Sequence, residues 1–218
     1  MDFDSNNVEK WKEELDAYQS RLQSLRKQNL LHLDHFYRTE LPSLFKERNP
    51  SPYITVSELS KLVQWKLTRG KWRPRLLDMV SSSKDEVVKS ASQKAFASIP
   101  DLKKAVSELT ILKGVGPATA SAVLAAYSPE IAPFMSDEAM EATLGTSKDY
   151  SLKQYLILAD KLQLKAKELT TDGDSFTPSD VERALWSAAV AMKLQASTTS
   201  TGSKAATGRA SGRKRKRN

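Results

Sequence analysis

The residues whose types and spacing point most directly to chemistry run from Leu109 to Ala120, in the order Leu-Thr-Ile-Leu-Lys-Gly-Val-Gly-Pro-Ala-Thr-Ala. Two glycines stand on either side of one apolar residue, and glycine allows backbone conformations and close approaches that a side chain forbids. The amides of such a turn and of the following helix start form a concave site for an anion. The sequence therefore predicts phosphate contacts, and a nucleic acid as the partner, at Lys113, Gly114, Val115, Gly116, Ala118 and Thr119.

The alternative for two closely spaced glycines is an ordinary tight turn between two core helices. The pattern Gly-x-Gly alone does not separate the two interpretations. The longer apolar string around the glycines, placed between two periodic helices, favours nucleic-acid binding.

A second stretch, from Lys61 to Arg75, contains six basic residues and no acid. Clustered lysine and arginine supply the salt-dependent attraction to phosphates. Loops presented by rigid helices often carry function, and Gly70 indicates a loop in this stretch. We expect four cations around this glycine to contact nucleic acid: Arg69, Lys71, Arg73 and Arg75.

The same stretch holds two tryptophans, Trp65 and Trp72. Both are candidates for base stacking, because an indole ring offers a flat face to a nucleobase. For Trp65 a place in the core is favoured, since Leu62, Trp65 and Arg69 fall on neighbouring helical turns and large aromatic side chains contribute much buried area.

The elements that must position these residues are helices throughout. Apolar residues recur at steps of three and four over residues 6–28, which predicts an N-terminal amphipathic helix in residues 1–28 that either docks on the protein or binds a partner. A helical domain follows over residues 29–195, with a helix ending at Gly70 and another over residues 150–169. Helix-start patterns occur at Thr55 with Glu58, Ser83 with Glu86, Pro100-Asp101, and Thr177-Pro178 with Asp180. Strand patterns are absent, so the predicted fold class is all-α.

The charge distribution separates residues 196–218 from the rest. The net charge is +8, and this segment holds seven cations and no acid, which leaves about +1 for the remainder. The segment is rich in Ser, Thr, Gly and Ala without apolar periodicity, so we expect a disordered basic tail. Its end is typical of a nuclear localisation signal for an import receptor, with a non-specific nucleic-acid contact as the alternative: Arg213, Lys214, Arg215, Lys216 and Arg217.

The composition also limits metal chemistry and location. The chain has no cysteine and two histidines, His32 and His35, so we expect no thiolate or histidine metal site. No apolar run reaches the roughly 18 residues that a membrane span needs, and the first residues lack the order of a signal peptide. We therefore expect no membrane association and no secretion.

The string from Leu112 to Gly116 resembles the hairpin of helix-hairpin-helix DNA-binding proteins. Together with Asp137 it is similar to the DNA glycosylases of that superfamily, and the likeness is strong over about residues 102–143. The resemblance implies a two-lobed helical fold whose hairpin amides hold DNA as a duplex. It also implies a monovalent cation on the carbonyls of Leu112 and Val115, with no other cofactor. Lys113 stands where the family usually has proline.

The resemblance assigns a catalytic group as well. The essential aspartate of the family matches Asp137, which would stabilise the positive charge on the sugar as a base leaves, or activate water, after the nucleotide is flipped out. The nucleophilic lysine of the bifunctional members falls on Ala118, which argues against lyase chemistry. The family pattern continues with a polar or histidine residue and then an arginine, and Glu138 and Glu141 depart from it. Additional acids repel a DNA backbone unless they turn away or hold a cation. A helix N-cap is the alternative role for Asp137.

These patterns predict a nuclear DNA-binding protein that resembles the monofunctional glycosylases of base excision repair. Two alternatives remain open. One is a non-catalytic DNA- or chromatin-binding module that keeps the same scaffold. The other is a protein-interaction adaptor that docks a partner through residues 6–28.

Overall fold

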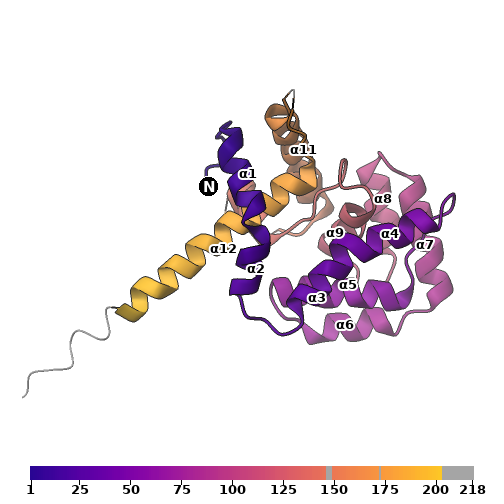
Figure 1. The fold of residues 1–218 in the computed structure, drawn as a ribbon. Helices are drawn as coiled ribbons and strands as arrows, with labels where there is room; N and C mark the ends of the chain where they lie inside the picture. The colour runs from indigo at the N-terminus through magenta and orange to yellow at the C-terminus, as the bar shows by residue number, and fades with distance from the viewer. Residues whose placement is uncertain (146–148, 172, 203–218) are drawn as a thin grey trace, which may run out of the picture.

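The computed structural model describes residues 1–145, 149–171 and 173–202, and within these ranges the chain is helical (Figure 1). The described residues contain no strand beyond an isolated antiparallel bridge between Thr171 and Asp174, so the predicted all-α class is confirmed. The elements are α1 (Val8–Asp16), α2 (Tyr18–Ser24), α3 (Leu30–His35), the π-helical turn η1 (Phe36–Glu40), α4 (Leu41–Glu47), α5 (Val56–Arg69), α6 (Pro74–Ser81), α7 (Asp85–Ala97), α8 (Leu102–Thr110), α9 (Pro117–Tyr127), α10 (Asp137–Leu144), α11 (Leu152–Leu169) and α12 (Pro178–Gly202).

The N-terminal amphipathic segment forms two helices, α1 and α2, which meet at Ala17. Trp11, Tyr18 and Leu22 from its apolar stripe are buried, and both helices pack against α12. The indole N–H of Trp11 also donates a 2.8 Å hydrogen bond to the carbonyl of Ser5. The stripe is therefore part of the core of this chain, as the docked-helix interpretation expects.

The helix starts show where local sequence patterns decide the structure and where they do not. At α5 the predicted capping box is present: the Thr55 hydroxyl accepts the Glu58 amide, and the Glu58 carboxylate accepts the Thr55 amide. The capping box predicted from the same pattern at Ser83 is wrong, because no side chain caps the start of α7. The Ser83 amide instead donates to the carbonyl of Val80, so this serine belongs to the turn that closes α6.

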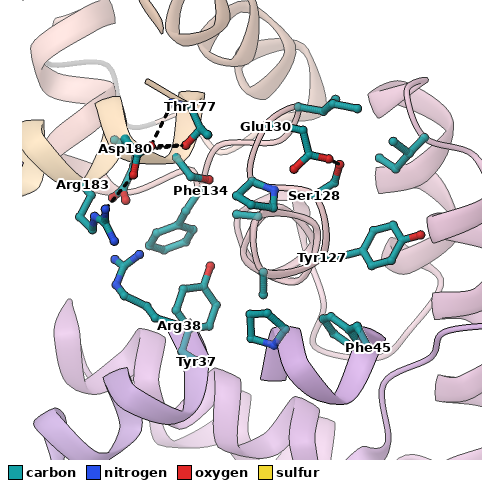
Figure 2. A pocket seen from close by; sticks show the side chains of 18 of the residues that line it. Tyr37, Arg38, Phe45, Tyr127, Ser128, Glu130, Phe134, Thr177, Asp180 and Arg183 are labelled. Carbon is teal, nitrogen blue, oxygen red and sulfur yellow. Dashed lines mark hydrogen bonds and ion pairs between the residues drawn. The ribbon is translucent and has the colours of Figure 1, made fainter. Parts of the chain in front are cut away.

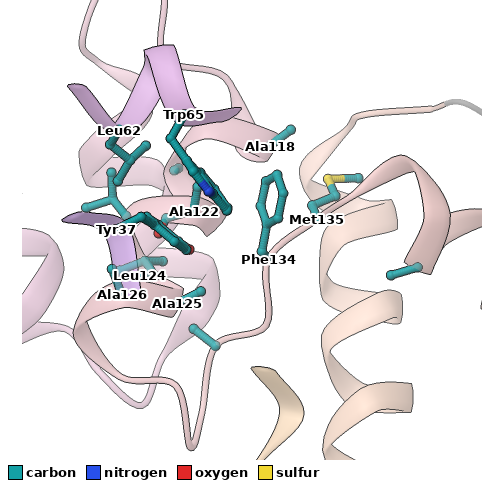
Figure 3. Packing of buried hydrophobic residues seen from close by; sticks show 14 of the residues in the cluster. Tyr37, Leu62, Trp65, Ala118, Ala122, Leu124, Ala125, Ala126, Phe134 and Met135 are labelled. Carbon is teal, nitrogen blue, oxygen red and sulfur yellow. The ribbon is translucent and has the colours of Figure 1, made fainter. Parts of the chain in front are cut away.

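Helix α9 lies at the centre of the fold. Its residues from 118 to 126 are buried all round, and their side chains are mostly small, which lets aromatic rings approach the helix. Figure 3 shows Tyr37, Trp65 and Phe134 packed beside it. The rings of Tyr37 and Trp65 stack with centroids 3.6 Å apart, and the Tyr37 hydroxyl donates to the Ala122 carbonyl. This cluster fixes α5 against α9.

The helices form two groups, with α1, α2, α11 and α12 on one side and α3 to α9 on the other (Figure 1). A buried ion pair between Arg69 of α5 and Glu182 of α12 joins the groups. None of the described helices is long and apolar enough to cross a membrane.

At its C-terminal end, α12 continues to Gly202, past residue 196 where we expected the basic tail to begin. The predicted localisation signal at residues 213–217 lies outside the described residues.

Candidate nucleic-acid interface

The turn between α8 and α9, the end of α5 and the start of α10 border one pocket with a volume of about 640 Å³. Residues predicted separately from the sequence meet in its lining: Arg69, Lys71, Arg73, Gly114, Gly116, Ala118, Thr119 and Asp137. The other five residues predicted to contact nucleic acid do not line it: Trp65, Trp72, Arg75, Lys113 and Val115. The proposed phosphate-binding turn, part of the basic stretch and the carboxylate therefore face a common space.

The two glycines of the turn serve different purposes. Gly114 has φ +83°, and a Cβ atom there would lie 2.9 Å from the Cβ of Met79, so both conformation and packing require glycine. Gly116 is the N-cap of α9 in extended conformation, and a Cβ atom there would meet nothing within 4 Å. Among the described residues, no group accepts a hydrogen bond from the amides of Gly116 or Ala118. These two donors at a helix start are available to an anion.

The residues that flank the glycines differ in exposure. Lys113 is exposed, whereas the side chain of Val115 is buried in the core. The Val115 amide donates a 3.0 Å hydrogen bond to the Leu112 carbonyl, which closes the turn. Val115 therefore supports the turn from inside and offers no side-chain surface to a nucleic acid.

The prediction that Arg69 contacts nucleic acid is wrong. Arg69 is the last residue of α5, only 4 % exposed, and its guanidinium donates to both carboxylate oxygens of Glu182 at 3.0 and 3.4 Å. Its guanidinium carbon lies 4.4 Å from the ring centroid of Trp186. Helix α5 extends to Arg69 and the loop begins only at Gly70, so Arg69 borders the pocket from inside the fold. Its charge serves the ion pair with Glu182.

The two tryptophans of the basic stretch have opposite environments. Trp65 is 0 % exposed and its indole N–H donates to the carboxylate of Asp34 at 2.8 Å. Its core assignment is confirmed, and base stacking by Trp65 is excluded because no face of the ring is accessible. Trp72 is 55 % exposed between Lys71 and Arg73, so its stacking role stays a prediction.

The other three cations predicted to contact nucleic acid, Lys71, Arg73 and Arg75, are exposed. Lys71 and Arg73 lie in the connection between α5 and α6 and line the pocket. The Arg73 guanidinium carbon lies 5.9 Å from the ring centroid of Tyr150, which also lines the pocket. Arg75 falls in the first turn of α6, a helix that the sequence interpretation missed, and is not part of the pocket lining.

Asp137 is exposed and is the first residue of α10. The N-cap is Ser136, whose hydroxyl accepts the Ala139 amide, so the carboxylate of Asp137 is not needed to cap the helix. One of its oxygens accepts a 2.8 Å hydrogen bond from the Tyr150 hydroxyl. Burial, and then this bond, raise the pKa of Tyr150 to about 12, so the hydroxyl remains a donor at neutral pH.

Sequence reasoning missed Lys66, which lies in the pocket lining one helical turn before Gly70. Its ammonium donates a 3.2 Å hydrogen bond to the hydroxyl of Thr119, and no carboxylate of the described residues lies within ion-pair distance. Burial, and then the charge of Arg73, lower its pKa to about 8, against the opposite effect of Asp137. The acid-free run from Lys61 to Arg75 contained this residue, but its direction into the pocket depends on the packing of α5 against α9.

Two further lysines modify the pocket rim. The ammonium of Lys27 donates to the carbonyls of Thr68 and Arg69, at 2.6 and 3.1 Å, and so caps the end of α5. Lys193 of α12 pairs with Glu138 at 2.8 Å. Burial alone would raise the pKa of Glu138, but the Lys193 bond and the Arg69 charge lower it overall.

The two acids that depart from the glycosylase pattern differ in their position relative to the pocket and in their ion pairs. Glu138 borders the pocket and is neutralised by Lys193, whereas Glu141 is exposed and does not border it. Because Arg69 is paired with Glu182 and Lys193 with Glu138, the lining cations without an acidic partner still outnumber the remaining acid: Lys27, Lys66, Lys71 and Arg73 against Asp137. Local arrangement, and not the net charge, makes this pocket attractive to a polyanion.

Comparison of the chain with protein-family models, with curated proteins and with solved structures gives no match.

Proposed function

We propose that this chain is a nuclear DNA-binding protein that holds one nucleotide of a duplex in the pocket beside Asp137 and removes its base, without lyase chemistry at Ala118. The observation that carries the proposal is the convergence of the glycine turn, Lys71, Arg73 and Asp137 on one pocket. Its volume of about 640 Å³ lies within the range of small-molecule pockets and is large enough for one flipped nucleotide.

Phosphate binding rests on the turn before α9. The free amides of Gly116 and Ala118 supply two donors, and Lys71 and Arg73 supply charge in the same pocket lining. An anion between these groups gains hydrogen bonds and Coulomb attraction together. Because these contacts address the backbone, they position DNA without reading its sequence.

Base removal rests on Asp137. When the bond from the sugar to the base breaks, the bonding electrons leave with the base and positive charge develops on the sugar. A carboxylate nearby stabilises that charge, and a water molecule then adds to the sugar carbon and transfers a proton to Asp137. The Tyr150 hydroxyl positions the carboxylate by occupying one oxygen and leaves the other for this proton.

A second candidate is a DNA- or chromatin-binding module without excision. The exposure of Asp137 favours it, because solvent weakens the stabilisation that a carboxylate gives to a developing positive charge. Both candidates use the same phosphate contacts, so the chemical step alone separates them.

The deciding experiment measures free-base release from duplexes that each carry one deaminated, alkylated or oxidised base, and binding to the same duplexes over a salt series. We expect binding that weakens as salt rises, and release that Asp137→Asn removes while binding remains. Glu141→Gln is the matched control, because Glu141 is also an acid of α10 but lies outside the pocket lining.

Binding without release from any duplex would identify the non-catalytic module. Absence of binding to duplex and single-stranded DNA at low salt would overturn both candidates.

A further inference from the structure

A second pocket, with a volume of about 710 Å³, lies at the opposite end of α9 from the glycine turn (Figure 2). Its walls are η1 and α4, the segment that follows α9, and the first turns of α12. None of the residues assigned to nucleic-acid contact lines it. The proposed DNA site therefore does not account for this pocket.

Two arginines meet at one end of this pocket. Figure 2 shows the guanidinium groups of Arg38 and Arg183 facing one another near Tyr37 and Phe134. Their guanidinium carbons lie 4.5 and 5.8 Å from the ring centroid of the same residue, Tyr18. Burial, and then the like charge of Arg38, lower the pKa of Arg183. The two cations are close enough to repel each other.

The existing partners of these arginines leave part of each guanidinium unused. Arg38 donates from Nη2 to the Tyr18 hydroxyl at 3.0 Å, and its Nε lies 3.4 Å from an oxygen of Asp34. Arg183 donates from Nη2 to Asp180 at 2.7 Å. Within the described parts of the chain, neither Nη1 atom has an acceptor.

The acids that border the pocket are already engaged. Glu182 is bound to Arg69, Asp180 accepts from the amide and hydroxyl of Thr177, and Glu130 accepts from the Ser128 hydroxyl. Lys46, a third cation in the lining, has no ion-pair partner among the described residues. Each arginine keeps one Nη1 donor for an added acceptor, while the lining as a whole balances three cations, Arg38, Lys46 and Arg183, against three acids, Glu130, Asp180 and Glu182.

From these observations we infer that the pocket binds a small organic anion, with its phosphate or carboxylate group between Arg38 and Arg183 and an apolar or aromatic body against Phe134 and Tyr37. Paired guanidinium groups suit both oxyanions, because each presents planar donors that match two oxygens. The bound negative charge reduces the repulsion between the arginines, and the aromatic side chains give the body an apolar wall.

The test is a titration of the full chain, followed by NMR of its backbone amides, with phenyl phosphate, phenylacetate and neutral benzyl alcohol. We expect both anions to shift amides around Ala125 and Arg183, and benzyl alcohol to shift them much less at equal concentration. Tighter binding of phenyl phosphate would assign a phosphate ligand, and equal or tighter binding of phenylacetate a carboxylate ligand.

Variants then link the effect to the arginine pair. Arg183→Gln should weaken phenyl phosphate binding at least about tenfold, because it removes a charge-assisted contact. Arg183→Lys should restore part of it. Lys10→Gln, which removes an equally positive but exposed side chain from α1, should leave the affinity unchanged. Equal responses to benzyl alcohol and phenyl phosphate, or unchanged affinity in a folded Arg183→Gln, would overturn the inference. DNA binding by Arg183→Gln is measured separately, so failure here leaves the proposed function untouched.

Discussion

The ammonium of Lys66 donates a hydrogen bond to the hydroxyl of Thr119 across 3.2 Å, which links the last turns of α5 to the first turn of α9 inside the pocket beside Asp137. Lys66 is thereby held beside the helix start that carries the free amides. Burial removes much of its hydration without supplying a carboxylate partner, which explains its pKa of about 8.

The first prediction concerns the pH dependence of stability. The pKa of Lys66 is about 8 in the folded protein and 10.5 for an ordinary lysine, so between these values the unfolded chain binds more protons. The contribution of Lys66 to the free energy of unfolding therefore rises as pH increases from about 8 to 10.5. Urea denaturation of the wild type and of Lys66→Met at several pH values checks this. The wild type should gain stability relative to the variant over this window, and a constant difference would contradict the assigned environment.

The second prediction concerns the turn. Gly116 is an N-cap in extended conformation with open space around its Cα, and aspartate is a favourable N-cap residue. Gly116→Asp should therefore fold normally in a thermal melt while placing a negative charge where a phosphate would bind. We expect DNA affinity to fall at least about tenfold, the equivalent of roughly 1.4 kcal/mol, in a fluorescence-anisotropy titration.

Gly116→Asn is the matched control for that substitution, since asparagine has the same shape and cap function without the charge. Its loss of affinity should be clearly smaller. Equal losses for the two variants would show that space, and not phosphate charge, governs the site.

The third prediction concerns the buried pair of Arg69 and Glu182, each with its side chain 2 % exposed. Arg69→Met leaves the Glu182 carboxylate buried without its cation and should lower the free energy of unfolding by about 3–5 kcal/mol. The double variant Arg69→Met with Glu182→Leu removes both charges and should recover most of the loss. Chemical denaturation of the wild type, Arg69→Met and the double variant measures these differences. An Arg69→Met protein as stable as the wild type would refute the structural role of Arg69.

Local patterns predicted much of the fold. The capping box at Thr55, the N-cap at Asp101 and the stop at Gly70 are confirmed because each depends on residues within one helical turn. The helix cap predicted at Ser83 is absent because the Ser83 amide donates to the carbonyl of Val80 at the end of α6. A helix start is thus predictable only where no competing element ends beside it.

The candidate site was predictable in part, for a related reason. Gly114 and Gly116 could be selected from their type and spacing, and Asp137 from the resemblance to the glycosylases, and all three line one pocket. The role of Arg69 could not, because its partner Glu182 is distant in the chain and meets it only after α5 packs against α12. The same holds for Glu138, whose neutralisation by Lys193 depends on the position of α12.

The ring of Phe134 lines both pockets, with Arg69 bordering one and its partner Glu182 bordering the other. At Phe134 the two cavities are therefore separated by one side chain. A rotation of Phe134 into one cavity would narrow that cavity and widen the other. Occupants of the two pockets would compete for that space even though they never touch.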